Sequence, residues 1–132
     1  MKILFIGSEF VGRNVQTLLL RDNKDHAFAL VRDFVNACTV LHKWEPELVI
    51  HEWDEDDCSL TMEELAVSHG IPVLALTPEL SPDVRRILNR IDRTETLDKP
   101  DIHYIMTSGF HHRLVAAVRR LETLVKPKRH AA

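Results

Sequence analysis

The chain has 132 residues, of which 45% are hydrophobic and 28% are charged, and its formal net charge is −3 at pH 7. This length and composition are typical of one globular domain that buries its own hydrophobic core. The slightly acidic balance lacks the basic field that draws proteins to nucleic acid, so DNA and RNA partners are not expected.

Targeting and membrane signals are weak in this sequence. The N-terminal run MKILFIG resembles the start of a signal peptide, but it is too short and continues into a strand–turn–helix pattern. No apolar stretch approaches the ~20 residues of a membrane-spanning helix. Cys38 and Cys58 form neither a disulfide framework nor a CxxC site. We therefore expect a cytoplasmic protein with reduced thiols and no membrane partner.

Strand and helix patterns alternate along the chain. Residues 2–7 form a continuous apolar run that predicts a strand buried on both faces, and 10–21 has apolar residues at helical spacing. Further strands are predicted at 26–31, 48–53, 71–76 and 102–107, and further helices at 34–44, 61–70, 82–93 and 110–125. Residues 1–125 are therefore predicted to form a single domain, followed by a basic flexible tail at 126–132.

Several boundaries of these elements carry local signals. Thr61 with Glu64 three residues later fits a capping box, in which Thr61 is the N-cap, and Gly70 fits the end of the same helix. Ser81 before Pro82 fits an N-cap followed by proline at the first helical position. The polar stretch 94–101 predicts an irregular surface loop before the fifth strand.

Five strands alternating with five helices predict an α/β fold. We expect a flavodoxin-like, doubly wound, five-stranded parallel sheet covered by helices on both faces, in three α/β/α layers. In such folds, functional side chains gather at the carboxyl ends of the strands. The segments to inspect are therefore 7–9, 32–33, 52–57, 77–78 and 107–109.

Three segments of the sequence resemble those of response-regulator receiver domains. The run 46–52 (PELVIHE) resembles the strand whose last residue accepts a phosphoryl group. The run 71–78 (IPVLALTP) resembles the strand that carries the switch hydroxyl, and 110–121 (FHHRLVAAVRRL) resembles the last receiver helix. The resemblance covers nearly the whole chain and implies the same fold.

The resemblance also implies roles for individual positions, and several of them depart from the receiver pattern. Receivers place an acidic pair after the first strand to hold Mg²⁺, whereas Gly7 and Ser8 stand here, with Glu9 next to them. The phospho-acceptor position holds Glu52 in place of aspartate, and the switch position keeps Thr77. This pocket is therefore predicted to be degenerate.

The position of the receiver lysine depends on where the fifth strand lies. If 102–107 is that strand, Thr107 takes the lysine position. Lys99 fits the usual spacing from Thr77, but the residues before it make a poor buried strand. We therefore expect Thr107 in the degenerate pocket.

Phosphoryl transfer to a carboxylate needs Mg²⁺ and a cation to neutralise developing charge. Without the acidic pair and the lysine, the resemblance implies a pseudo-receiver related to two-component signalling, in which Glu52 mimics a permanent negative charge. Such a module needs no cofactor and acts through contact with another protein rather than as an enzyme. Receivers use the face of their last helices and strand for such contacts, so a homodimer through this face is one expectation.

A second hypothesis concerns the turn from Gly7 to Gly12. It follows a strand and opens a helix, as in the G-x-G-x-x-G dinucleotide fingerprint, with Glu9 at the middle glycine. A small Rossmann-like protein would use Gly7, Ser8 and Gly12 for the phosphates of NAD(P) or another nucleotide, with Arg32 and Asp33 near the ribose. The surrounding sequence resembles the start of nucleotide-sugar epimerases, although their Tyr-x-x-x-Lys pair is missing.

The acidic segment after the third strand offers weak metal candidates. Glu52 and Asp54 supply carboxylates of the kind that bind Mg²⁺ or Ca²⁺. A solvated, self-repelling loop explains the same residues, and we favour that interpretation.

Overall fold

A computed structural model describes residues 1–54, 60–78, 82–106 and 109–125 of the chain. Its five strands are β1 (Lys2–Ile6), β2 (Ala27–Val31), β3 (Leu48–Glu52), β4 (Val73–Thr77) and β5 (Thr94–Asp98). Its helices are α1 (Glu9–Asp22), α2 (Phe34–Trp44), α3 (Thr61–Ser68), α4 (Pro82–Arg90) and α5 (Phe110–Glu122), with a short 3₁₀ helix at Ile102–Tyr104.

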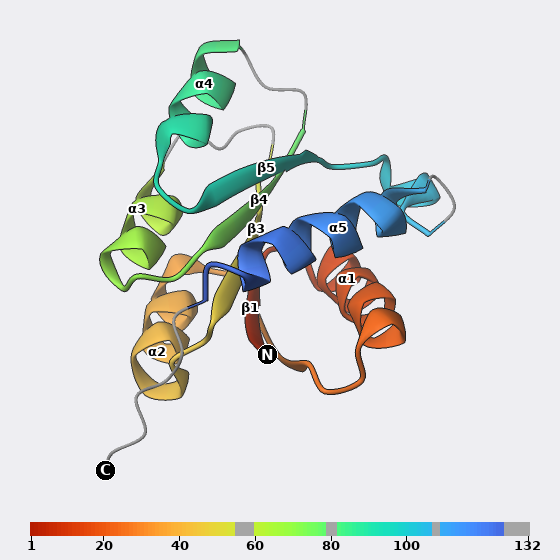
Figure 1. Ribbon diagram of the computed structural model, residues 1–132, viewed down its shortest axis with the longest axis horizontal. Coiled ribbons are helices and arrows are strands. Elements are labelled where there is room, and N and C mark those ends of the chain that lie inside the picture. Colours follow the sequence, from red (N-terminus) through yellow and green to blue (C-terminus); the bar gives the residue numbers. More distant parts are fainter. Residues whose placement is uncertain (55–59, 79–81, 107–108, 126–132) are drawn as a thin grey trace.

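The strands form one parallel sheet in the order β2-β1-β3-β4-β5. Helices α1 and α5 cover one face of the sheet, and α2, α3 and α4 cover the other (Figure 1). The prediction of a flavodoxin-like, three-layer α/β/α fold is therefore confirmed. The strand order reverses direction between β1 and β3, which is the place where ligands bind in open α/β sheets.

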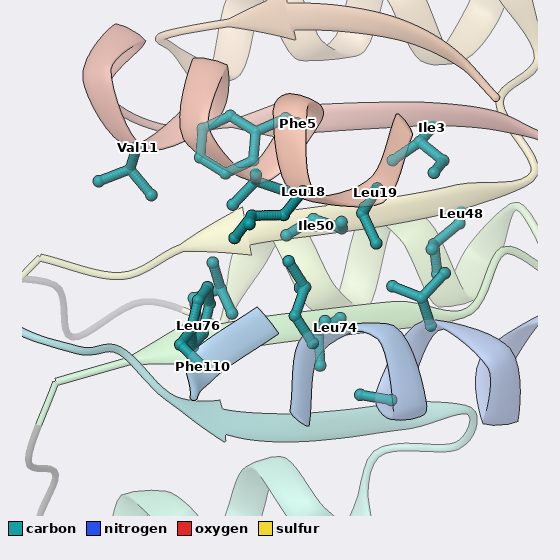
Figure 2. Close-up of a cluster of buried hydrophobic side chains, with 14 of the residues drawn as sticks. Ile3, Phe5, Val11, Leu18, Leu19, Leu48, Ile50, Leu74, Leu76 and Phe110 are labelled. Atoms are coloured by element: carbon teal, nitrogen blue, oxygen red, sulfur yellow. The ribbon is translucent and has the colours of Figure 1, made fainter. Parts of the chain in front are cut away.

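The central strands β1, β3 and β4 are apolar because both of their faces are buried. Side chains on one face of the sheet, such as Phe5, Ile50 and Leu76, pack with α1 and α5 into the larger core cluster (Figure 2). Side chains on the opposite face, such as Val49, pack against α2 and α3. These two clusters hold the carboxyl ends of the central strands at one edge of the molecule.

The fifth strand is not where the sequence pattern predicts it. Residues Thr94–Asp98 form β5, and the predicted strand 102–107 begins instead with the 3₁₀ helix. The prediction failed because 94–98 has few apolar residues. In the structure β5 is an edge strand, and ion pairs with the covering helices satisfy its polar side chains: Asp98 with Arg85 of α4, and Glu95 with Arg120 of α5.

The apolar residues after β5 have a different role. Ile105 is buried in the core cluster under α1 and α5, whereas Ile102 and Tyr104 are exposed. This apolar run therefore closes one end of the core without pairing in the sheet.

The local signals for helix ends were partly right. Helix α3 begins at Thr61 itself, with Leu60 at the N-cap position and no side-chain cap bond, so the predicted capping box is wrong. Gly70 has a positive φ of 71° just after that helix, as a glycine at a helix end should. Ser81 and the tail 126–132 lie outside the described residues.

His26, just before β2, gives the stability of the fold a pH dependence. Burial, and then the charged N-terminus, lower the pKa of His26 from its ordinary value of 6.5. Between pH 6.5 and the lower pKa of the folded state, the unfolded chain therefore binds more protons than the folded chain, so stability falls as the pH drops through this interval. We expect an NMR titration midpoint of His26 below 6.5, and a shallower loss of urea stability between pH 7 and 5 in His26→Gln. Equal slopes for both proteins would contradict this assignment.

Candidate functional site

The carboxyl ends of four strands bring together residues that are far apart in the sequence. Glu52 ends β3, Ser8 follows β1, Thr77 ends β4 and Lys99 follows β5. Three of these four were predicted as pocket residues. Because the strands are parallel, their ends meet at one edge of the sheet.

Glu52 is the centre of this group, and its carboxylate is bound on both oxygens. Its Oε1 accepts hydrogen bonds from the Ser8 backbone N–H and from Ser8 Oγ, each at 2.8 Å. Its Oε2 accepts from Lys99 Nζ at 2.9 Å, and the side chain is only 5% exposed. Lys99 Nζ also donates to the carbonyl oxygen of Trp53, at 3.2 Å. We call Ser8, Glu52 and Lys99 the carboxylate site.

Gly7 makes this arrangement possible. Its φ is +155°, and a Cβ added to it would lie 2.6 Å from both Cβ and Oε1 of Glu52. The absence of a side chain therefore lets the β1–α1 turn close over the carboxylate. Ser8 is also the N-cap of α1, where its Oγ accepts from the N–H of Val11 at 3.4 Å.

Glu9 does not join Glu52 as a second carboxylate of the site. It is half-exposed and points to two arginines, with Arg13 at 2.6 Å and Arg32 at 3.7 Å. The receiver-type acidic pair is therefore not assembled by the β1–α1 turn. This outward position also explains how a glutamate is tolerated in a tight turn.

The metal candidates are also not brought into a ligand set. Both oxygens of Glu52 accept from N–H or O–H donors, and Asp54 is exposed beyond the end of β3. Within the described part of the chain, no group of three His, Cys, Asp or Glu side chains is placed to hold an ion.

Thr77 lies beside the carboxylate site at the end of β4. Its side chain is buried, with 1% exposure, and its hydroxyl has no hydrogen-bond partner among the described residues. Its backbone oxygen accepts from the N–H of Lys99 at 2.8 Å, so β4 helps to position the lysine.

Lys99 directly follows β5, so it takes the position after the fifth strand that the sequence pattern assigns to Thr107. Thr107 itself lies outside the described residues. The spacing of Lys99 from Thr77 was the correct signal in the sequence. That signal is masked in the sequence because the strand before Lys99 has the polar composition of an edge strand.

The Gly7–Gly12 turn is built for packing rather than for phosphates. A Cβ on Gly12 would lie 2.8 Å from the ring of Phe5, so this glycine lets α1 approach β1. The N–H and hydroxyl of Ser8, which would face a phosphate, already bind Glu52. Asp33 caps α2 by accepting from the N–H of Asn36 at 2.8 Å. These contacts do not favour the dinucleotide hypothesis.

A buried polar cluster next to the site was missed by sequence reasoning. Glu63 of α3 is fully buried, and its Oε1 accepts from Trp53 Nε1 at 2.7 Å and lies 2.6 Å from His51 Nδ1. A glutamate in the first turn of a helix reads as a surface residue, so the sequence gives little signal for this contact. The cluster attaches the start of α3 to the end of β3.

In the described part of the chain, no helix is both long enough and apolar enough to span a lipid bilayer.

Comparisons with known proteins bear on the fold. No protein-family profile and no curated protein sequence matches the chain. Solved structures do: the Mn²⁺-bound form of response regulator Rcp1 has a TM-score of 0.71 at 21% identity, covering 96% of this chain and 99% of that one. Chemotaxis response regulator CheY4 of Vibrio cholerae has a TM-score of 0.66 at 19% identity, covering 91% and 97%.

A third similar structure is the signal receiver domain of a DNA-binding response regulator from Colwellia psychrerythraea. Its TM-score is 0.68 at 14% identity, and the match covers 90% of this chain and 98% of that one. Identities this low establish a shared fold and not a shared activity. The chain therefore has the fold of a response-regulator receiver domain.

Proposed function

We propose that this protein is a cytoplasmic, receiver-like regulatory module that acts by contacting another protein and does not depend on phosphorylation. The observation that carries the proposal is that both carboxylate oxygens of Glu52 already accept hydrogen bonds from within the protein. Ser8 and Lys99 occupy both oxygens of the carboxylate that stands at the phospho-acceptor position.

The chemistry of phosphoryl transfer supports this proposal. A carboxylate accepts a phosphoryl group when a divalent cation and a positioned lysine neutralise the charge that develops. Here the lysine is present, but the positions of the acidic pair are Gly7 and Ser8, and Ser8 donates to the acceptor itself. Attack through Oε1 of this buried carboxylate would have to displace both hydrogen bonds from Ser8, and attack through Oε2 would have to displace the bond from Lys99.

The surface made by α4, β5 and α5 suits the proposed contact with a protein. Arg85 and Arg120 are paired with Asp98 and Glu95 of β5, so this surface carries both signs of charge. Ile87 of α4 is 48% exposed on the same helix as Arg85. A twofold interface joins the same surface of two copies, and a surface with both signs of charge can place opposite charges across it, so we propose a second copy of the chain as its partner.

The test exposes the purified protein to acetyl phosphate and Mg²⁺, beside a receiver domain that is known to accept phosphate. Intact-mass spectrometry and sedimentation are then recorded for the same samples. We expect no phosphoryl adduct on this protein, and the same dimer mass before and after treatment. An adduct on the wild-type protein that disappears in Glu52→Gln would overturn phosphorylation independence, and a monomer throughout would overturn the dimer.

A further inference from the structure

A cleft of about 590 Å³ lies beside the carboxylate site, on the face that α2 and α3 cover. It shares Gly7, Ser8 and Glu52 with that site and extends to Phe34 at the start of α2 and Met62 near the start of α3. The cleft sits at the ends of β1 and β3, where the strand order changes direction. Its volume is within the range of pockets that hold small molecules.

The cleft is lined by apolar residues of the core and by one exposed aromatic ring. Ile6 and Met62 are nearly buried and belong to the core cluster under α2 and α3. Phe34 also lines the cleft, but its side chain is 44% exposed. A half-exposed aromatic ring in a cleft that is also lined by buried apolar residues favours a flat ligand that stacks on the ring.

Arg32 carries a positive charge in the cleft that is only weakly neutralised by neighbouring acidic side chains. Its side chain is 73% exposed, and it forms a 3.7 Å ion pair with Glu9, whose carboxylate lies closer to Arg13 at 2.6 Å. The charge of Glu52 is met by Lys99. The guanidinium of Arg32 therefore keeps N–H donors for an anionic group, which it binds well in a bidentate manner.

His51 contributes a ring that is fixed in place. Its Nδ1 lies 2.6 Å from the buried Glu63, and the side chain is 12% exposed where it lines the cleft. Because Nδ1 is engaged, Nε2 is the ring atom left to make a polar contact. A pre-oriented ring lowers the entropy cost of binding.

We propose that this cleft binds a small planar aromatic anion, with the ring on Phe34 and the anionic group on Arg32. The site differs from the dinucleotide hypothesis because it does not use the N–H groups of the Gly7–Gly12 turn. It is also independent of whether Glu52 accepts phosphate. The protein would then sense a metabolite of this chemical class next to its carboxylate site.

The experiment uses 2-naphthoate as the probe and records ¹H–¹⁵N NMR spectra during titration. We expect saturable shifts at Ile6, Arg32 and His51, and affinity about tenfold lower in Arg32→Gln and in Phe34→Ala. Arg21→Gln is the matched control, since Arg21 is also an exposed arginine but does not line the cleft. Val35→Ala controls for exposed apolar surface outside the cleft, and both controls should bind 2-naphthoate as the wild type does.

Two further probes test the sign of the charge and the need for the ring. Because Asp54 also lines the cleft, 2-naphthylmethylammonium is compared with 2-naphthoate, and acetate is added alone. Binding of the aromatic cation as tight as that of the anion would overturn the proposal. So would equal losses in Arg21→Gln and Arg32→Gln, or the absence of saturable shifts with 2-naphthoate.

Discussion

Replacing Gly7 with alanine is expected to destabilise the protein by about 2 to 4 kcal/mol. The new Cβ would lie 2.6 Å from Cβ and Oε1 of Glu52, and the backbone would keep a φ of +155° that side chains rarely adopt. Glu52 would have to move, and its bonds to Ser8 and Lys99 would lengthen. Urea unfolding followed by tryptophan fluorescence measures the loss, which is a large share of the 5–15 kcal/mol typical of a domain.

Gly109 provides the matched control for this prediction. Its φ is also positive, at +73°, but a Cβ there meets no atom within 4 Å. Gly109→Ala should therefore cost only the backbone strain, about 1 kcal/mol. If both variants lose the same stability, the close approach of Gly7 to Glu52 does not contribute, and our account of the turn is wrong.

Removal of the Glu63 carboxylate is expected to cost about 3 to 5 kcal/mol in Glu63→Ala. The substitution leaves the buried Trp53 Nε1–H without its acceptor and His51 without its partner, and it opens space in a closed region. Glu63→Gln should cost less, because an amide oxygen of similar size can still accept from Trp53. Stability is again measured by urea unfolding, and the near-UV circular dichroism of the tryptophans reports local order.

Glu64 is the control residue for the buried carboxylate. It is the next residue of α3 and is exposed, so Glu64→Ala should change stability by less than about 0.5 kcal/mol. A similar loss in Glu63→Ala and Glu64→Ala would show that helix propensity, and not the buried cluster, explains the effect.

The central part of the fold was predictable because strands that are buried on both faces consist mainly of consecutive apolar residues. Strands β1, β3 and β4 each contain three or four consecutive apolar residues, and the helices between them have apolar residues at helical spacing. Three members of the strand-end group, Ser8, Glu52 and Thr77, could be placed because each follows or ends such a run. The resemblance to receivers then assigned their positions.

The parts that failed depend on contacts between distant segments. Strand β5 has a polar sequence. It is stable in the sheet because Arg85 and Arg120, from the helices before and after it in the sequence, form ion pairs with its acidic side chains. Because the fifth strand was predicted at 102–107, Lys99 was not predicted to belong to the pocket. Glu63 was missed because its burial depends on Trp53 and His51, ten and twelve residues earlier. A local pattern cannot record such pairs.

The carboxylate site also bears on how the chain folds. Ser8 and Lys99 are 44 and 47 residues from Glu52 in the sequence, on opposite sides of it. The carboxylate can leave water at little cost only after both the first and the last strands have docked. Contacts of such long range form late, after the loop-closure entropy has been met. The site is therefore a marker of the completed fold, and weakening it should speed unfolding more than it slows folding.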